Sequence, residues 1–325
     1  MNNTIRQNMT RLLSLVMLTS LLITSVLPIT SVEAANFTPI KKSAYYWKNF
    51  TLTNFQDRLA KSKDQGIKVL YVNIEFFLNP WLDQRKSFAQ INNMINMAKD
   101  YGISIHAMMG NTTWSDPFTD EIIYRAFAFI KKYNDTNPFA IIEGYHLNIE
   151  FYNKPNYNDS RHYFTQNFIK FSENFAAEVK AYQYYVPQFS LSTTIPHFAD
   201  YDRYIPAVDY NGYKQTLFDH MAKIFNNLPN SNLIIMAYRS KGVGEDTITD
   251  IVKNEFDIAK NRFPNLKIIL AVETIDIGDR NVSFYGKSRR EIDRELLKVH
   301  YDLKSVKAYN GIAIHVLDTY VDLND

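Results

Sequence analysis

Three polar residues alternate with aliphatic ones in the stretch EGYHLNIEFYN, residues 143–153. His146, Asn148 and Glu150 are spaced two residues apart. In an extended strand, side chains two apart point to the same face, so this spacing predicts a polar row that ends in a carboxylate. A polar row inside a fold needs hydrogen-bonding partners or a ligand, and its Glu is a candidate general acid.

A second carboxylate and several aromatic side chains occupy comparable places. Glu273 directly follows the aliphatic run KIILAV and is a candidate partner for Glu150. Glycoside hydrolysis uses two such groups, one of which protonates the leaving oxygen. Aromatic rings beside carboxylates suit the apolar faces of sugars, so we expect a carbohydrate substrate or ligand. The candidate substrate-binding residues are Trp47, Glu75, Trp114, His146, Asn148, Tyr238, Arg239 and His315.

Other chemistries lack their motifs. The chain has no Cys, which excludes thiolate catalysis and disulfides. It contains no GxSxG, HExxH or glycine-rich phosphate loop. The net charge is +2 and no basic stripe is interleaved with aromatics, so nucleic acid is not an expected partner. We expect no metal and no cofactor, with a metal-dependent hydrolase or lyase as a less favoured alternative.

The candidate residues belong to a regular alternation of strand-like and helix-like segments. Strands are predicted at 43–47, 66–77, 103–110, 144–151, 188–195, 232–239, 266–274 and 310–317. Helices are predicted at 52–65, 88–101, 121–133, 161–182, 213–226, 247–262 and 289–304. This alternation predicts an α/β protein with a (β/α)8 barrel, since the alternative, an open doubly wound sheet, usually carries a glycine-rich phosphate loop.

The strand ends should gather the candidate residues. Active sites of such barrels form at the C-terminal ends of the strands, and all three Trp residues fall at or just after predicted strand ends. Glycines at the other ends should cap the preceding helices. These glycines, each just before or at the start of a predicted strand, are Gly66, Gly102, Gly144 and Gly311.

Residues 1–35 have the layout of a secretory signal peptide. A weakly basic start is followed by an apolar run over 12–29 and by small residues at Ala34 and Ala35. We expect cleavage after one of these alanines and a single barrel domain over 36–325; a retained membrane anchor is the alternative. The absence of Cys from an exported chain is typical of Gram-positive bacteria, so we expect an extracellular or cell-wall location.

The opening stretch also resembles a family signature. Family 18 chitinases and endo-β-N-acetylglucosaminidases are (β/α)8 barrels with DGxDxDxE on strand four, and EGYHLNIE has the same spacing. The family's strand-six Met-x-Tyr resembles Met236-Ala-Tyr238. The positions identical to the family motifs are Gly144, Glu150, Met236 and Tyr238. The resemblance implies that Glu150 is the general acid and that the substrate is a β-linked glycan of chitin, cell-wall or N-glycan type.

One departure from the signature leaves the mechanism open. The family's Asp two residues before the acid orients the substrate N-acetyl group, which is the nucleophile, whereas this chain has the neutral Asn148. Glu273 could supply the second carboxylate, as in the barrel clan with carboxylates after strands four and seven. That clan has Asn directly before the acid, where this chain has Ile149. The alternative is a non-catalytic glycan-binding protein similar to chitinase-like lectins.

Overall fold

The computed structural model describes residues 39–48, 52–117 and 119–323. The predicted signal peptide, residues 1–35, lies outside these residues. Within them, no helix has the length and apolar character needed to cross a membrane.

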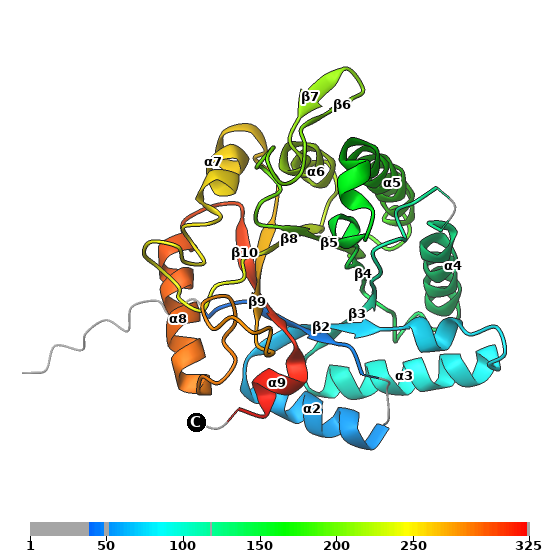
Figure 1. Ribbon diagram of the computed structural model, residues 1–325. Helices are drawn as coiled ribbons and strands as arrows, with labels where there is room; N and C mark the ends of the chain where they lie inside the picture. The colour runs from blue at the N-terminus through cyan, green and yellow to red at the C-terminus, as the bar shows by residue number, and fades with distance from the viewer. Residues whose placement is uncertain (1–38, 49–51, 118, 324–325) are drawn as a thin grey trace, which may run out of the picture. The chain divides into compact units, whose positions relative to one another are not determined.

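Eight parallel strands close into a barrel, as the sequence predicts (Figure 1). Around the barrel their order is β1, β10, β9, β8, β5, β4, β3 and β2. β4 and β9 are separated by two strands, so their ends face each other across the barrel mouth. The bounds are β1 Lys42–Tyr46, β2 Ile67–Asn73, β3 Ser104–Met109, β4 Gly144–Leu147, β5 Ser190–Pro196, β8 Asn232–Met236, β9 Ile268–Glu273 and β10 Tyr309–His315.

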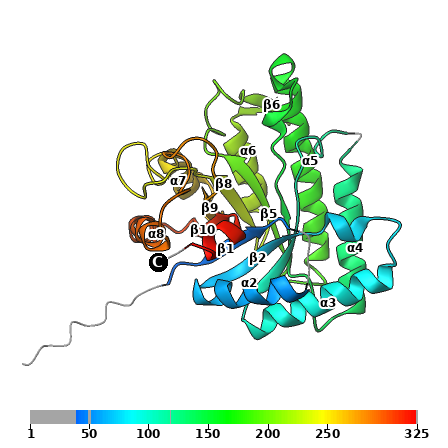
Figure 2. The same cartoon turned by 60° about the horizontal axis from the view of Figure 1, so that its bottom comes forward.

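Helices surround the strands on the outside (Figure 2). The seven predicted helices are all present, and a short helix, α9 (Leu317–Val321), follows the last strand. Their bounds are α2 Leu52–Asp64, α3 Gln84–Asp100, α4 Glu121–Thr136, α5 Arg161–Tyr182, α6 Leu217–Asn226, α7 Lys253–Arg262 and α8 Arg289–Leu303. Short 3-10 turns lie at Glu75–Leu78, Phe151–Asn153 and Tyr157–Asp159.

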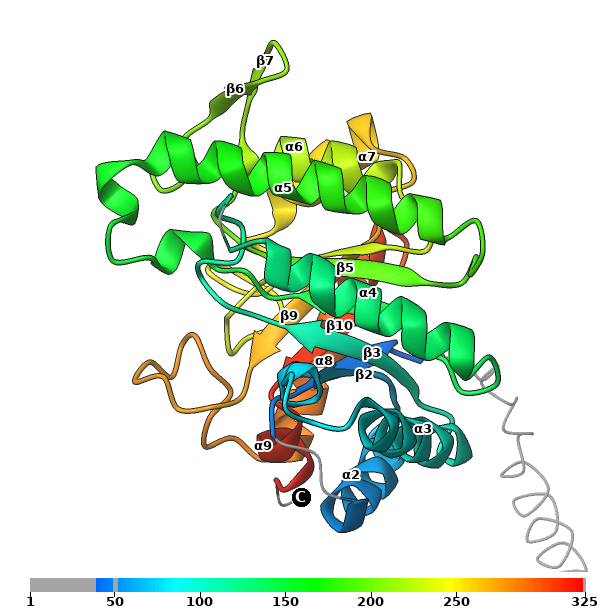
Figure 3. The same ribbon diagram turned by 90° about the vertical axis from the view of Figure 1, so that its right-hand side faces the viewer.

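Three predicted helix starts are wrong: α3 begins at Gln84, four residues before the expected residue 88, and two other helices begin late. The segment expected as a helix from 213 begins with an antiparallel hairpin, β6 (Val208–Tyr210) and β7 (Tyr213–Gln215), which projects away from the barrel (Figure 3). Its turn is Asn211-Gly212, with positive φ at both residues, as two-residue hairpin turns require. Thr216 then caps α6 by accepting a hydrogen bond from the Asp219 N–H.

The helix expected from 247 begins six residues late, at Lys253. Residues 248 and 249 use their backbone N–H groups differently from a helix: Ile248 donates to the Lys241 carbonyl and Thr249 to that of Gly242. The segment before α7 is therefore a folded-back turn.

The four marked glycines divide into two kinds. Gly66 and Gly102 have φ of +72° and +69° after a helix, which confirms them as caps. Gly144 and Gly311 lie inside strands β4 and β10, so the capping prediction is wrong for them. A Cβ on Gly144 would lie 2.5 Å from Nδ1 of His106, and one on Gly311 would lie 2.3 Å from a backbone oxygen. These two positions need glycine because a neighbour approaches closely.

Apolar side chains form two layers. The larger layer lies between strands and helices and includes Leu147 and Ile149. The smaller layer fills the barrel and contains Tyr45, Tyr71 and Met236, with Trp47 and Tyr238 packed against it. The barrel is therefore a packed core that opens only at its mouth.

Candidate functional site

The polar row of the opening stretch faces the barrel interior. β4 ends at Leu147, and the Asn148 N–H extends its ladder by donating to the Met109 carbonyl at 2.9 Å. Leu147 and Ile149 pack toward the helices, whereas the His146 ring packs against Tyr71. Alternation then places Asn148 and Glu150 above His146, at the mouth.

Glu150 is partly exposed and is held by three side-chain donors. Asn148 Nδ2 lies 3.2 Å from Oε1, and the Tyr152 hydroxyl and Asn153 Nδ2 lie 3.2 and 2.7 Å from Oε2. Tyr152 and Asn153 belong to the 3-10 turn that follows directly. The next residue, Lys154, is buried and forms an ion pair with Asp116, which ties this turn to the β3 loop.

The amide of Asn148 has a fixed orientation. The Thr194 hydroxyl of β5 donates to its Oδ1, and its Nδ2 donates to Glu150. One amide hydrogen and one lone pair of the carbonyl oxygen remain for a ligand. Asn148 is thus presented to the mouth as a neutral hydrogen-bonding group beside the carboxylate.

His146 lies too deep to touch a ligand. It is fully buried, and its Nδ1 lies 2.9 Å from the Ser192 hydroxyl. Burial lowers the pKa of the His146 imidazole to about 3, and His106 and His315 add to the lowering. The ring is therefore neutral and packs as part of the barrel core.

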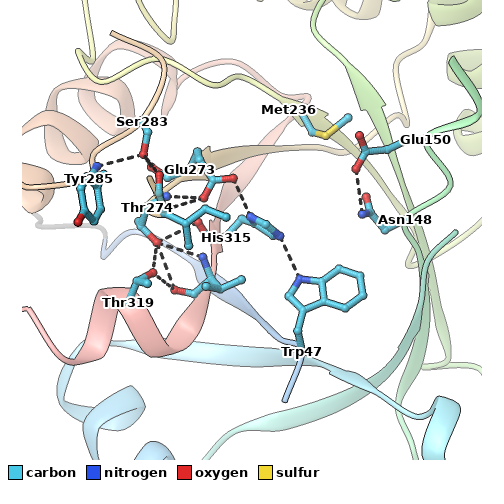
Figure 4. A network of polar contacts seen from close by, with 12 residues as sticks. Trp47, Asn148, Glu150, Met236, Glu273, Thr274, Ser283, Tyr285, His315 and Thr319 are labelled. Atoms are coloured by element: carbon cyan, nitrogen blue, oxygen red, sulfur yellow. Dashed lines mark hydrogen bonds and ion pairs between the residues drawn. The ribbon is translucent and has the colours of Figure 1, made fainter. Parts of the chain in front are cut away.

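Glu273 ends β9 on the other side of the mouth and is only 3% exposed (Figure 4). Its Oε1 accepts hydrogen bonds from the backbone N–H groups of Thr274 and Ile275, at 2.7 and 2.9 Å. Its Oε2 lies 2.8 Å from His315 Nδ1. The other nitrogen of His315, Nε2, lies 3.0 Å from the Trp47 indole nitrogen.

The charges of both carboxylates influence the same two tyrosine hydroxyls. Burial raises the pKa of the Tyr238 hydroxyl well above its usual value, and the charges of Glu273 and Glu150 add to the shift. The pKa of Tyr45 is also raised, by burial first, with contributions from the same two carboxylates. Tyr238 also stacks on His315, with ring centroids 6.4 Å apart. The two phenols are therefore close enough to Glu150 and Glu273 to be affected by their charges.

Three expected substrate-binding residues lie apart from this centre. Glu75 and Trp114 line a separate cavity of about 550 Å³ between the β2 and β3 loops and α4. Burial raises the pKa of Glu75 there. Arg239 pairs with Asp246 at 2.7 Å and donates to the Tyr238 carbonyl, so its own loop engages its guanidinium.

Four further residues at the centre were not among the residues expected from the sequence. Tyr152 and Asn153 follow Glu150 directly, but the predicted strand over 144–151 concealed the turn that brings them back to it. Thr194 had no signal beyond its place in a predicted strand. Tyr45 is 2% exposed, and its hydroxyl has no partner among the described residues. Its position two residues before Trp47 was the available signal.

Metal-ligating side chains do not gather in the described part of the chain. No group of three His, Asp or Glu residues there is arranged to hold a metal ion. The polar groups at the mouth are instead two carboxylates, amides, phenols and an indole.

Comparisons with known proteins give the fold. No protein-family model and no curated protein matches the sequence. Among solved structures, the GH18 chitinase of Cycas revoluta in complex with (GlcNAc)3 is 12% identical, with a TM-score of 0.54 over 87% of this chain and 96% of that chain. The spore cortex-lytic enzyme SleL of Bacillus cereus is 11% identical, with a TM-score of 0.50 over 86% and 71%. This chain is accordingly a (β/α)8 barrel with a fold similar to that of GH18 chitinases.

Proposed function

We propose that the protein is a glycoside hydrolase-like enzyme that acts on a β-linked glycan, with Glu150 as the general acid. The observation that carries the proposal is the setting of Glu150. It follows β4 at the mouth of a chitinase-like barrel and is partly exposed, and its charge acts on Tyr238, which packs with Trp47 against the barrel core.

The chemistry assigns a role to each group. Glu150 would protonate the glycosidic oxygen as the bond to the sugar breaks. The free hydrogen and lone pair of Asn148 would hold an N-acetyl amide, and the neutral Tyr238 hydroxyl would donate to the substrate. Trp47 would stack on the apolar face of a sugar ring.

The test is turnover of chitooligosaccharides, peptidoglycan and N-glycans by the wild type, Glu150→Gln and a control, Glu245→Gln, in which an exposed carboxylate of the loop between β8 and α7 is neutralised. We expect Glu150→Gln to lower turnover by about 10²–10⁴-fold while glycan binding is retained. Unchanged turnover in Glu150→Gln would refute the assignment of Glu150. A chelator should have no effect, since the proposed acid needs no metal.

Asn148 favours a second candidate function. A neutral amide cannot offer negative charge to a cyclised N-acetyl intermediate, and its Nδ2 is engaged with Glu150. A glycan-binding protein without catalysis would have the same mouth. Binding of chitooligosaccharides without turnover by the wild type, unchanged in Glu150→Gln, would establish this lectin function in place of the enzyme.

We further propose that residues 1–35 direct export and are removed, so that the barrel domain over 36–325 acts outside a Gram-positive cell or in its wall. Amino-terminal sequencing of the protein recovered from culture medium tests the proposal. We expect the mature chain to begin at Ala35 or Asn36, and a chain that keeps residues 1–34 would contradict cleavage.

A further inference from the structure

The hydrogen-bond chain from Trp47 to Glu273 has a defined direction. An indole nitrogen can only donate, so His315 Nε2, 3.0 Å away, must be the acceptor and carries no proton. The proton of the neutral ring is then on Nδ1, which donates to Glu273 Oε2 at 2.8 Å. Donation therefore runs from Trp47 through His315 to Glu273 and fixes one tautomer of the ring.

Glu273 is poorly placed to react with a sugar. Its Oε1 accepts two backbone N–H groups and its Oε2 accepts His315, so protein donors occupy both oxygens. The carboxylate is also almost fully buried. A nucleophile or base must instead present an oxygen within reach of the substrate.

Trp47 lies below His315, to one side of the gap between Glu273 and Glu150 (Figure 4). Its nitrogen meets His315, while its opposite edge lies over Gly110: a Cβ there would be 3.1 Å from Cη2 of Trp47 and 2.7 Å from the Asn148 backbone oxygen. Tyr45 stacks on the ring, with centroids 6.5 Å apart and planes at 14°. The indole thus reaches from His315 of β10 to Gly110, which itself lies against the Asn148 backbone.

We propose that Glu273 is a positioning residue that acts through His315 to hold the Trp47 indole in place as the surface on which a sugar ring stacks. The stacking of a sugar on Trp47 rests on the proposed function, whereas the positioning of Trp47 by Glu273 does not. Glu273 thereby sets where the sugar lies relative to Glu150 and takes no direct part in bond breaking.

Glu273→Gln replaces an acceptor oxygen with an N–H donor in a side chain of nearly the same volume, so the direction of hydrogen-bond donation from Trp47 through His315 can no longer be kept without a conflict. If the amide nitrogen faces His315, the ring must carry its proton on Nε2, where it opposes the Trp47 N–H. If the amide is turned over, its nitrogen instead opposes the two backbone N–H groups. The first arrangement sets one N–H group against another N–H group, whereas the second sets two N–H groups against the amide nitrogen. The first therefore costs less, so we expect His315 to change tautomer and the Trp47 indole to lose its hydrogen-bond acceptor.

The direct readout is nuclear magnetic resonance of the indole N–H groups and histidine ring nitrogens, with the Trp47 signal identified by its absence in Trp47→Phe. In Glu273→Gln we expect the Trp47 N–H to exchange with solvent about tenfold faster or more, because it has lost a hydrogen bond. An unchanged tautomer and unchanged exchange would overturn the proposal. Glu245→Gln is the control and should match the wild type.

A double-mutant cycle supplies the functional readout, with chitotriose as the probe. Trp47→Phe keeps a ring but removes the donor. If Glu273 acts through the indole, each single variant raises Kd or KM about tenfold, kcat stays within about threefold, and the double variant is no worse than Trp47→Phe. Additive effects, or a kcat loss of about a hundredfold in Glu273→Gln, would make Glu273 an independent catalytic group and overturn the proposal.

Failure of the proposed function gives a different result. If the wild type binds no glycan, the stacking role of Trp47 falls with the proposed function, and the indole exchange rate still decides whether Glu273 positions Trp47. Should Glu273→Gln not fold, Glu273→Asp tests the same link, since its shorter side chain withdraws the carboxylate from His315. Exchange of the Trp47 N–H as slow as in the wild type would then overturn the link.

Discussion

Glu150 and Glu273 lie on facing sides of the same barrel mouth, after β4 and at the end of β9, yet their surroundings are opposite. Glu150 is partly exposed and accepts hydrogen bonds from side chains close to it in sequence. Glu273 is buried and accepts hydrogen bonds from backbone N–H groups and from His315. Side-chain donors can turn aside when a ligand arrives, but backbone donors cannot. This difference is what the two proposals require, with Glu150 available for chemistry and Glu273 holding its neighbours in place.

The largest expected effect is on stability. Glu273→Ala leaves two backbone N–H groups and the His315 N–H without an acceptor in a buried place, so we expect a loss of about 4 kcal/mol of unfolding free energy. Glu150→Ala should cost about 1 kcal/mol or less, because its partners can turn to water. Urea unfolding of both variants measures the difference. Equal losses would remove the contrast between the two carboxylates.

A third carboxylate, Glu255, allows the effect of burial to be distinguished from the effect of hydrogen bonding. Glu255 in α7 is fully buried like Glu273, but its oxygens have no hydrogen-bond partner among the described residues. Burial raises its pKa to about 9, and the charge of Asp200 adds to the shift. Since the folded pKa exceeds the unfolded one, the folded protein binds the extra proton, and stability is full below the unfolded pKa and falls as the pH rises toward 9.

Glu255→Gln should therefore remove a pH dependence. Between pH 5 and 7.5 we expect the wild type to lose about 3 kcal/mol relative to this variant, at about 1.4 kcal/mol per pH unit. Asp257→Asn, an exposed position on the same helix, is the control and should follow the wild type. Parallel stability curves for wild type and Glu255→Gln would show that Glu255 is ionised in the fold.

Asn148→Asp alters a residue beside Glu150, on the side of the mouth proposed to carry out the chemistry. The new carboxyl group and Glu150 would have to share a proton across a contact of 3.2 Å, and a negative charge would become available to an N-acetyl group. We expect turnover of chitooligosaccharides to rise about tenfold, because a charge-assisted hydrogen bond to the N-acetyl group would replace a neutral one. Asn153→Asp, which also adds a carboxyl group beside Glu150, is the matched control. An equal rise in both variants would attribute the gain to charge alone.

The smallest effect is expected in the separate cavity. Trp114→Ala alters a wall shared with Glu75 and lies apart from both carboxylates. We expect KM to rise about threefold for long oligosaccharides and to stay unchanged for a disaccharide, since lost contact area alone weakens binding modestly. Steady-state kinetics over a series of chain lengths measures this. A loss for the disaccharide would place Trp114 at the reacting centre.

The sequence was sufficient for the barrel because periodicity reports burial directly. Aliphatic runs at 232–236 and 268–273 are buried on both faces and cannot be amphipathic helices, and their regular alternation with helices admits few folds. The alternation of His146, Asn148 and Glu150 also predicted their common face, since side-chain direction along a strand is local.

Contacts between distant segments were beyond sequence reasoning. The partners of Glu273 come from its own backbone and from His315, 42 residues away, so its burial has no local signal. The predicted strand over 144–151 was too long because Ile149 and Phe151 favour strands, and the 3-10 turn that begins at Phe151 overrides that preference. The hairpin at Asn211-Gly212 did have a local signal, which the helical pattern after it outweighed.

The indole of Trp47 also limits what the barrel can recognise. Beneath it, Tyr45 and His146 are almost inaccessible, so the space enclosed by the strands offers no volume to a ligand. A glycan, if the proposed function holds, would then contact only the surface of the mouth, and the surrounding loops would determine which lengths and branches are accepted. Exchange of those loops could therefore alter specificity while the folded barrel beneath stays the same.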